Sequence, residues 1–287
     1  MNWTPKLSIA IPASLVSDTP HLREKTYKIG MIGRAAAIFR VEEIVIYPDQ
    51  PDKDQRKDAR LIELILSYME TPQYLRKRIF KLRPELRYVG VLPPLRTPHH
   101  PTTSHSKDLR IGECREGIVI SSSRKGSKVY IGVEKPAFIR GVRLPAGRRV
   151  TVKIKDLKRE IEAVLVDREE IKDYWGYRVV VSEKSLGKIL KNWDLIIATS
   201  KYGAPFMKIK KEFTQKWLKA KRRIILFGSP SAGLYEILGL EGLNLDEIAD
   251  FVVNTIPLQG VETVRTEEAV YASLAIFNLF ISSDNQV

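Results

Sequence analysis

Apolar and polar positions alternate in blocks along the C-terminal third of the chain. Three short apolar runs, at 195–198, 224–227 and 251–253, each give way to a loop of small and polar residues, and helical stretches separate them. Continuous β-branched runs of this length are typical of buried parallel strands. Because ligands of parallel sheets bind where loops leave the carboxyl ends of the strands, we expect the function to lie on these loops.

The N-terminal part follows the same alternation. The apolar run 7–11 predicts a strand, and we expect a helix from about Pro20, with Thr19 as its N-cap. A strand at 43–47 completes a β-α-β unit, and apolar spacing over 59–69 predicts a further helix. The first helix should bury one stripe, formed by Ile29, Ile32, Ala36 and Phe39.

The pattern changes in the middle of the chain. Four prolines within 93–104 exclude a regular helix or a central strand there, which indicates a linker or an extended loop. Between 111 and 182 the period becomes two, with short strands expected at 117–120, 128–133, 149–154, 162–166 and 177–181. Five such strands predict a small barrel of the oligonucleotide-binding type. The predicted organisation is an α/β domain from 1–92 and 186–287, with a barrel and its linker inserted at 93–185.

Charge adds a candidate partner. Lys and Arg outnumber Asp and Glu by 48 to 34, a formal charge of +14. Segments 74–87, 140–159 and 208–223 are almost purely basic, whereas 236–268 is acidic. A charge-rich thermophilic surface is the alternative, but such surfaces interleave both signs. One-signed blocks favour a polyanion, of which nucleic acid is the commonest.

Composition excludes several classes of protein. No apolar run is long enough to span a membrane, and the N-terminus does not have the pattern of a signal peptide, so we expect a cytoplasmic protein. Cys114 is the only cysteine, which rules out an intrachain disulfide and a thiolate metal cluster. Three of the four histidines (His21, His99, His100 and His105) lie in the proline-rich segment without nearby acids at ligand spacing. We therefore interpret the histidines as loop residues that could contact phosphate, and we predict no metal site.

Arg34 is the most notable polar residue of the first predicted helix. It lies off the apolar stripe and on the same side as Gly30. Glycine inside a helix costs about 1 kcal/mol relative to alanine. Gly30 and Gly33 therefore indicate that another chain or a ligand approaches the helix closely near Arg34, although a lone helical arginine is also common on solvated surfaces.

Three motifs in order resemble those of a known superfamily. Residues 32–41, followed by a strand, resemble the first motif of the SPOUT methyltransferases, in which an arginine on the first helix faces the site. Residues 227–234 are similar to the second motif and 254–269 to the third. Within that superfamily the chain resembles the archaeal and eukaryotic branch of RNA uridine N3-methyltransferases, where the proline and histidine run 94–101 and an inserted barrel also occur.

The resemblance implies a knotted α/β domain that binds S-adenosylmethionine, and a homodimer with the site near its interface. The implied cofactor-binding residues are Thr199, Phe227, Gly228, Ser229, Gly233, Asn254, Thr255, Ile256, Pro257, Leu258, Thr266 and Ala269.

Arg34 and Arg265 are the candidate catalytic residues. The run 265–268 stands where tRNA ribose-methylating members carry an asparagine and serine pattern, which argues against 2′-O methylation and leaves the catalytic base open. Glu267 and Glu268 favour the dipole of the helix that Thr266 opens.

We therefore expect an S-adenosylmethionine-dependent methyltransferase acting on a base of ribosomal RNA, at uridine N3, with Arg34 stabilising negative charge on the ring oxygens. A helix over 74–87 and the barrel would bind RNA through Arg76, Lys77, Arg78, Arg96, Arg148, Arg149 and Lys153. Tyr130, Phe138 and Tyr177 are candidate stacking platforms, although for each of them we favour core packing. Two rival functions are a protein methyltransferase with the same cofactor and a non-catalytic RNA-binding or ribosome assembly protein.

Overall fold

The computed structural model describes residues 6–281, which divide into two compact units. Unit 1 holds the residues up to Ser67, Glu85–Pro93 and the residues from Tyr177 onward, and unit 2 holds Tyr68–Pro84 and Pro94–Gly176. None of the helices in the described part of the chain is long and apolar enough to cross a membrane.

A parallel sheet of six strands forms the centre of unit 1. Its order is β11 (Phe251–Asn254), β9 (Leu195–Pro205), β10 (Arg222–Leu226), β1 (Lys6–Pro12), β2 (Glu43–Tyr47) and β8 (Arg178–Val181). Ile9, Ile11 and Ile225 are fully buried, as expected for strands covered on both faces. The parallel strands predicted from the three C-terminal apolar runs are thus confirmed.

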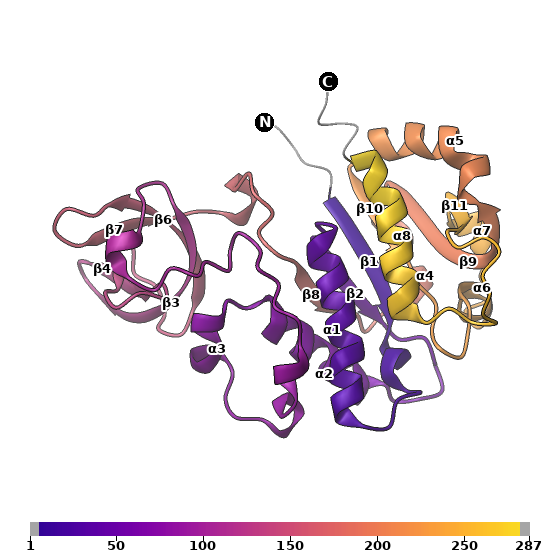
Figure 1. Cartoon of the computed structure of the whole chain (residues 1–287), viewed down its shortest axis with the longest axis horizontal. Helices are drawn as coiled ribbons and strands as arrows, with labels where there is room; N and C mark the ends of the chain where they lie inside the picture. The colour runs from indigo at the N-terminus through magenta and orange to yellow at the C-terminus, as the bar shows by residue number, and fades with distance from the viewer. Residues whose placement is uncertain (1–5, 282–287) are drawn as a thin grey trace. The chain divides into compact units, whose positions relative to one another are not determined.

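Helices cover both faces of this sheet. On one face, α4 (Leu186–Ile189), α6 (Leu234–Gly239) and α7 (Leu245–Ile248) pack on a cluster that includes Ala10, Val45 and Leu226. On the other face α1 (Leu22–Ile38) lies beside α8 (Thr266–Ile281), as Figure 1 shows in indigo and yellow. The helices α2 (Arg56–Glu70) and α5 (Phe206–Lys219) complete the larger elements of the α/β layer.

Unit 2 contains a closed five-stranded barrel. Its strands pair in the order β3 (Cys114–Ser123), β4 (Gly126–Tyr130), β5 (Ala137–Arg140), β7 (Ile161–Leu165) and β6 (Arg149–Asp156). Alternate residues such as Val129, Ile139 and Val152 fill its core. A barrel was predicted, and the structure has one.

The prediction that the strand at 177–181 belongs to the barrel was wrong. Residues 178–181 form β8, which pairs in parallel with β2 at the edge of the sheet in unit 1, and β5 takes the fifth place in the barrel. An edge strand alternates between exposed and half-buried residues. That period of two is also the pattern of a barrel strand, so the sequence does not separate the two cases.

Two helix boundaries also differ from prediction. The first helix begins at Leu22 with His21 at its N-cap, because the Thr19 hydroxyl donates to Asp18 at 3.0 Å instead of capping the helix. The helix expected over 74–87 ends early, since α3 spans Gln73–Ile79 and only a short 3-10 turn follows at Pro84–Leu86.

Candidate functional site

The loop after β10 is a tight turn at the carboxyl edge of the sheet. The Phe227 amide donates to the Ala10 carbonyl at 3.0 Å, and the Tyr47 hydroxyl donates to the Phe227 carbonyl at 2.6 Å. Within the turn, the Ser229 amide donates to the Ala232 carbonyl and the Ala232 amide donates to the Ser229 hydroxyl, both at 2.9 Å. A Cβ on Gly228 would lie 3.0 Å from the Ala232 carbonyl oxygen, so the turn has little room for a side chain there.

The loop after β11 is tied to this turn through the start of α8. The Thr266 hydroxyl donates to the Gly228 carbonyl at 3.0 Å. Deeper in the loop, the hydroxyls of Thr255 and Ser273 lie 2.9 Å apart and are buried. The structure therefore brings the second and third motifs together. We call residues 227–233, 254–258 and Thr266 the carboxyl-edge cradle.

The segment expected to be a loop after Ala198 continues as strand instead. Ala198 pairs with Val252 and Ala204 pairs with Val253, so residues 199–203 bulge out between two consecutive partners. A Cβ on Gly203 would lie 2.7 Å from the backbone of β11, and glycine permits this approach. The Thr199 hydroxyl donates to the Leu226 carbonyl at 2.8 Å, which holds the bulge against β10.

The remaining predicted cofactor residues lie around the same edge. The Asn254 side-chain amide donates to the Lys201 carbonyl at 3.0 Å, and the Gly233 amide donates to Glu236 at 3.0 Å at the start of α6. Ala269 lies in the first turn of α8. Leu258 has a left-handed backbone with φ of 61° and a fully exposed side chain. Strain and exposed apolar surface at one residue are typical of loops that close on a ligand.

The chemistry of this cradle fits an adenosyl group. Its side chains at 227–233 and 254–258 are small, apolar or uncharged polar, and a neutral purine and ribose need backbone donors and apolar contacts instead of charged partners.

Arg34 lies elsewhere on α1. Since α1 starts at the carboxyl edge and runs back along the sheet, Arg34 is about 9 Å farther along the helix axis than Lys28. Its charge acts on Tyr271 of α8, where burial raises the pKa of the tyrosine and Arg34 opposes that rise. A Cβ on Gly30 would lie 2.6 Å from Leu92, so the close approach expected at this glycine is made by this chain's own Leu92.

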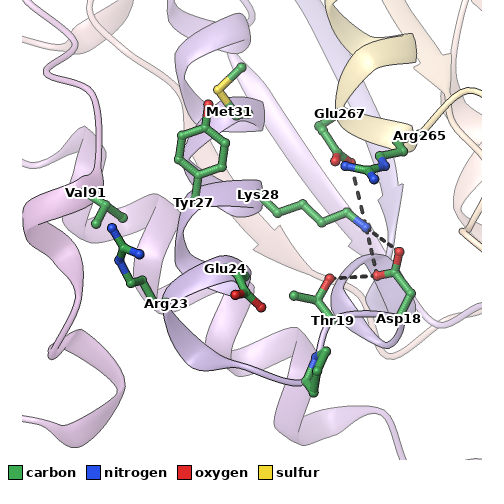
Figure 2. A pocket seen from close by; sticks show the side chains of 11 residues that line it. Asp18, Thr19, Arg23, Glu24, Tyr27, Lys28, Met31, Val91, Arg265 and Glu267 are labelled. Atoms are coloured by element: carbon green, nitrogen blue, oxygen red, sulfur yellow. Dashed lines mark hydrogen bonds and ion pairs between the residues drawn. The ribbon is translucent and has the colours of Figure 1, made fainter.

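A cavity of about 530 Å³ opens beside the start of α8, and sequence reasoning missed it. Its charged lining residues are Asp18, Arg23, Glu24, Lys28, Arg265 and Glu267, and Tyr27, Met31 and Val91 add apolar surface. Figure 2 shows Lys28 reaching from α1 toward Asp18 and Glu267. We call this the Lys28 cavity. One signal was present in the sequence, because Lys28 lies one helical turn before Ile32 on the buried side of α1.

The electrostatics of the Lys28 cavity are uneven. The Lys28 side chain is only 8% exposed, and its ammonium lies 2.8 Å and 3.0 Å from the two Asp18 oxygens but 3.8 Å from Glu267 Oε2. Burial disfavours ionised Asp18, yet the hydrogen bonds and charge of Lys28 outweigh it and lower the pKa of Asp18. For Glu267, burial dominates and raises the pKa despite the charges of Lys28 and Arg265.

The basic residues predicted for RNA binding separate into two groups in unit 2. Lys77, Arg78, Arg96, Arg148 and Lys153 are exposed, and the Arg78 guanidinium lies 4.3 Å from the centre of the Tyr130 ring. The Arg76 guanidinium instead donates to the carbonyls of Thr71 and Met69 at 2.9 Å and 3.0 Å.

Arg149 belongs to a buried polar network. Its guanidinium donates to Glu70 at 2.8 Å and 3.2 Å and to Glu116 at 2.6 Å. The Trp175 indole donates to Glu116 at 2.6 Å, and a ring nitrogen of fully buried His99 lies 3.4 Å from Glu70. We call these five residues the Arg149 network. Burial opposes ionisation of Glu70, but its bonds to His99 and Arg149 hold its pKa at about 2.

Burial decides the roles of the histidines and of Tyr177, for which stacking and core packing were the alternatives. His99 is not a loop residue open to phosphate, because it is fully buried. His100 is half-buried against the Glu70 carbonyl at 2.6 Å, and burial lowers its pKa to about 4. Tyr177 packs in the core as favoured from the sequence, because it is buried in unit 1 and its hydroxyl donates to the Leu66 carbonyl at 3.2 Å. Tyr130 and Phe138 are partly exposed.

Comparison with known proteins relates the whole described fold to one family. Residues 6–277 match the model of a family described as "Putative RNA methyltransferase". An uncharacterized protein of Haloarcula marismortui is 35% identical, over 95% of this chain and 98% of that protein. A human protein named 28S rRNA (uridine-N(3))-methyltransferase is 32% identical, over 94% of this chain and 77% of its own length. Its Drosophila melanogaster counterpart is 31% identical, over 94% of this chain and 61% of that protein.

Proposed function

The chain belongs to this RNA methyltransferase family, and we propose that it transfers a methyl group from S-adenosylmethionine to N3 of a uridine in ribosomal RNA. The observation that carries the proposal is the extent of the match. The family model spans the carboxyl-edge cradle, the Lys28 cavity and the barrel, and the relatives named as uridine-N3 enzymes align over 94% of this chain.

The carboxyl-edge cradle is the proposed cofactor site. S-adenosylmethionine supplies an electrophilic methyl group there, and the cradle residues hold and orient it. We propose that the segment from Phe227 to Ala269 forms the knot of the SPOUT superfamily. The bond from Thr266 to Gly228 supports this, because it joins the two motifs at the same edge through residues that are 38 positions apart.

Unit 2 is the proposed RNA-binding unit. Its exposed cations are Lys77, Arg78, Arg96, Arg148 and Lys153, which suit contacts to phosphates. Arg78 over Tyr130 joins a cation to an aromatic face, a common element of single-strand binding surfaces. Arg76 and Arg149 hold unit 2 together through their carbonyl and carboxylate partners, so we leave them out of this surface.

We also propose that the enzyme works as a homodimer in the cytoplasm. Arg34 lies on α1 about 9 Å beyond the cavity end of the helix. A second copy is a way to bring this arginine to a cradle, as the superfamily resemblance implies. Arg34 and Arg265 remain the proposed groups that stabilise negative charge on the base.

The test is methyl transfer to RNA that is free of protein. Purified enzyme is incubated with isotope-labelled S-adenosylmethionine and ribosomal RNA, and digested nucleosides are analysed by mass spectrometry. We expect labelled N3-methyluridine. Label found only in polypeptide would contradict the proposal, and so would calorimetry that detects no binding at millimolar S-adenosylmethionine.

A further inference from the structure

The Lys28 cavity contains a carboxylate oxygen that its surroundings leave unsatisfied. Glu267 Oε2 is buried and has no hydrogen-bond partner among residues 6–281. Lys28 is 3.8 Å away, which is ion-pair distance but too long for a hydrogen bond. A buried acceptor without a donor costs free energy, about 1–3 kcal/mol. The Glu267 side chain lines the cavity and is 12% exposed, so this carboxylate can meet a ligand there once its enclosed oxygen turns toward the cavity.

The neighbours of this oxygen define what ligand would fit. Lys28 and Arg265 place positive charge on Glu267 from α1 and from the residue before α8. Both also line the cavity. The wall thus holds the Glu267 carboxylate with two cationic side chains near it, beside the further carboxylates of Asp18 and Glu24. Uracil carries the complementary edge, because its N3–H donor stands between the O2 and O4 carbonyl acceptors. Cytosine, with an acceptor at N3 and an amine beside it, does not match.

The rest of the cavity suits a flat aromatic ring. Tyr27 is 54% exposed, so its ring is open to contact, and Met31 lies on the same helix one turn farther along. Enzymes that modify a base read its pairing edge with hydrogen bonds and hold its faces between aromatic or apolar side chains. Figure 2 shows these side chains on α1 and the carboxylate on α8.

The position beside the carboxyl-edge cradle completes the argument. Glu267 directly follows Thr266, whose hydroxyl is bonded to Gly228 of the cradle. A base in the Lys28 cavity therefore lies next to the loops proposed to hold the methyl donor.

We propose that the Lys28 cavity receives the target uracil and that Glu267 accepts the proton from its N3. This inference rests on the proposed function. The N3–H bond breaks and its proton bonds to the Glu267 carboxylate, while the electron pair left on N3 forms the new N–C bond to the methyl group. The bond from that methyl carbon to sulfur breaks, and its electron pair stays on sulfur. Lys28 joins Arg34 and Arg265, the groups proposed above, in stabilising the negative charge on O2 and O4.

The charges around Glu267 set its dependence on pH. Lys28 on α1 and Arg265 and Glu268 on the α8 side face it, and Asp18 neutralises much of the Lys28 charge. Burial raises the pKa of Glu267, which makes the carboxylate a stronger base than an exposed one. Since only ionised Glu267 accepts a proton, the rate should rise with pH through its pKa.

The first test compares Glu267→Gln with a matched control. In single-turnover methylation of a uridine-containing RNA, the variant should lose at least ~100-fold in rate. Binding of S-adenosylmethionine and of RNA should each stay within about twofold, by calorimetry and filter binding. Glu212→Gln is the control, because Glu212 is an exposed carboxylate on α5, outside the carboxyl-edge cradle and the Lys28 cavity, and should keep the wild-type rate. A Glu267→Gln rate within about threefold of wild type would overturn the proposal.

A second measurement separates proton transfer from a structural role. Fluorine at C5 makes the N3 proton of uridine more acidic, so RNA with 5-fluorouridine at the target depends less on a base. Glu267→Gln should recover at least ~10-fold of its lost rate on this RNA. The variant should also lose the rising limb of the pH profile. An equal deficit on both RNAs, with an unchanged pH profile, would show that Glu267 only supports the fold.

These outcomes are distinct from failure of the proposed function. If the wild-type protein forms no N3-methyluridine at all, the proposed function fails. If the wild-type protein methylates uridine and Glu267→Gln does so as well, the function stands and the assignment of the base is wrong.

Discussion

Each unit holds a cluster of charged side chains, but the hydrogen bonding of the two clusters differs. In the Arg149 network, both carboxylates and the guanidinium have several hydrogen-bond partners at 2.6–3.2 Å. In the Lys28 cavity, Asp18 takes the close contacts of the ammonium and Glu267 is left with a 3.8 Å contact and an unpaired oxygen. The first arrangement is typical of a group that holds a fold, and the second is the basis of the proposed contact with a ligand.

The largest expected effect is a loss of stability when the cation of the Arg149 network is removed. Arg149→Met leaves Glu70 and Glu116 buried without their cation, so unit 2 should lose about 3–5 kcal/mol of unfolding free energy. Urea unfolding followed by hydrogen exchange in the barrel strands measures this. Arg148→Met, at an exposed position next to it, should change stability by less than about 0.5 kcal/mol. Similar values for the two variants would contradict the comparison.

Replacing the cation of the Lys28 cavity by methionine should lower turnover more than stability. Lys28→Met removes the partner of Asp18, but that carboxylate is 44% exposed and water can solvate it. We expect less than about 1 kcal/mol of lost stability. The methylation rate should fall ~10–100-fold, because the donor beside the base is gone. Thermal unfolding and single-turnover kinetics on one preparation provide both values. A large loss of stability with a normal methylation rate would show that Lys28 supports the fold and would contradict its proposed role in turnover.

Arg34→Ala tests a charge that lies outside the Lys28 cavity. Affinity for S-adenosylmethionine should stay nearly unchanged, since Arg34 is not in the carboxyl-edge cradle, and turnover should fall about tenfold. Calorimetry with the cofactor and steady-state kinetics separate the two. Equal loss of affinity and turnover would reassign Arg34 to cofactor binding.

The smallest expected effect is a pH dependence of opposite sign in the two units. His100 has its pKa lowered to about 4, so the unfolded chain binds more protons and unit 2 loses stability as the pH falls below about 6.5. Between pH 7 and pH 6 the loss should be under about 1 kcal/mol. Glu70, with its pKa at about 2, adds a further loss only between about pH 4.5 and 2.

Glu267 acts in the reverse direction in unit 1. Its folded pKa is raised, so its contribution to stability is present below its unfolded pKa and is lost as the pH rises through the folded value. Hydrogen exchange at pH 6 and pH 7 in unit 2, and from pH 4.5 upward in unit 1, checks both signs. His100→Gln should remove the pH dependence of stability in unit 2 and leave that of unit 1. Stability that changes with pH in the same direction in both units would contradict this account.

Much of the fold was predictable because it depends on local patterns. The apolar runs at 7–11, 43–47 and 195–198 identified three of the parallel strands, and the change of period after 111 identified the barrel. The 178–181 strand was misplaced because an edge strand and a barrel strand share a period of two. Backbone pairing with β2, which is more than 130 residues away, decided between them.

The sequence by itself determined the strands, the motifs at the carboxyl edge, the family resemblance and the basic character of the chain, because each is written in contiguous residues. The tertiary structure alone decided which charged side chains have hydrogen-bond partners for their polar atoms and which keep an unpaired atom. Arg149 meets Glu70 across 79 residues, and Lys28 meets Glu267 only where α1 and α8 start at the same edge of the sheet. Burial and the distances between side chains set the pKa of a carboxylate, and neither is a property of neighbouring positions in a sequence.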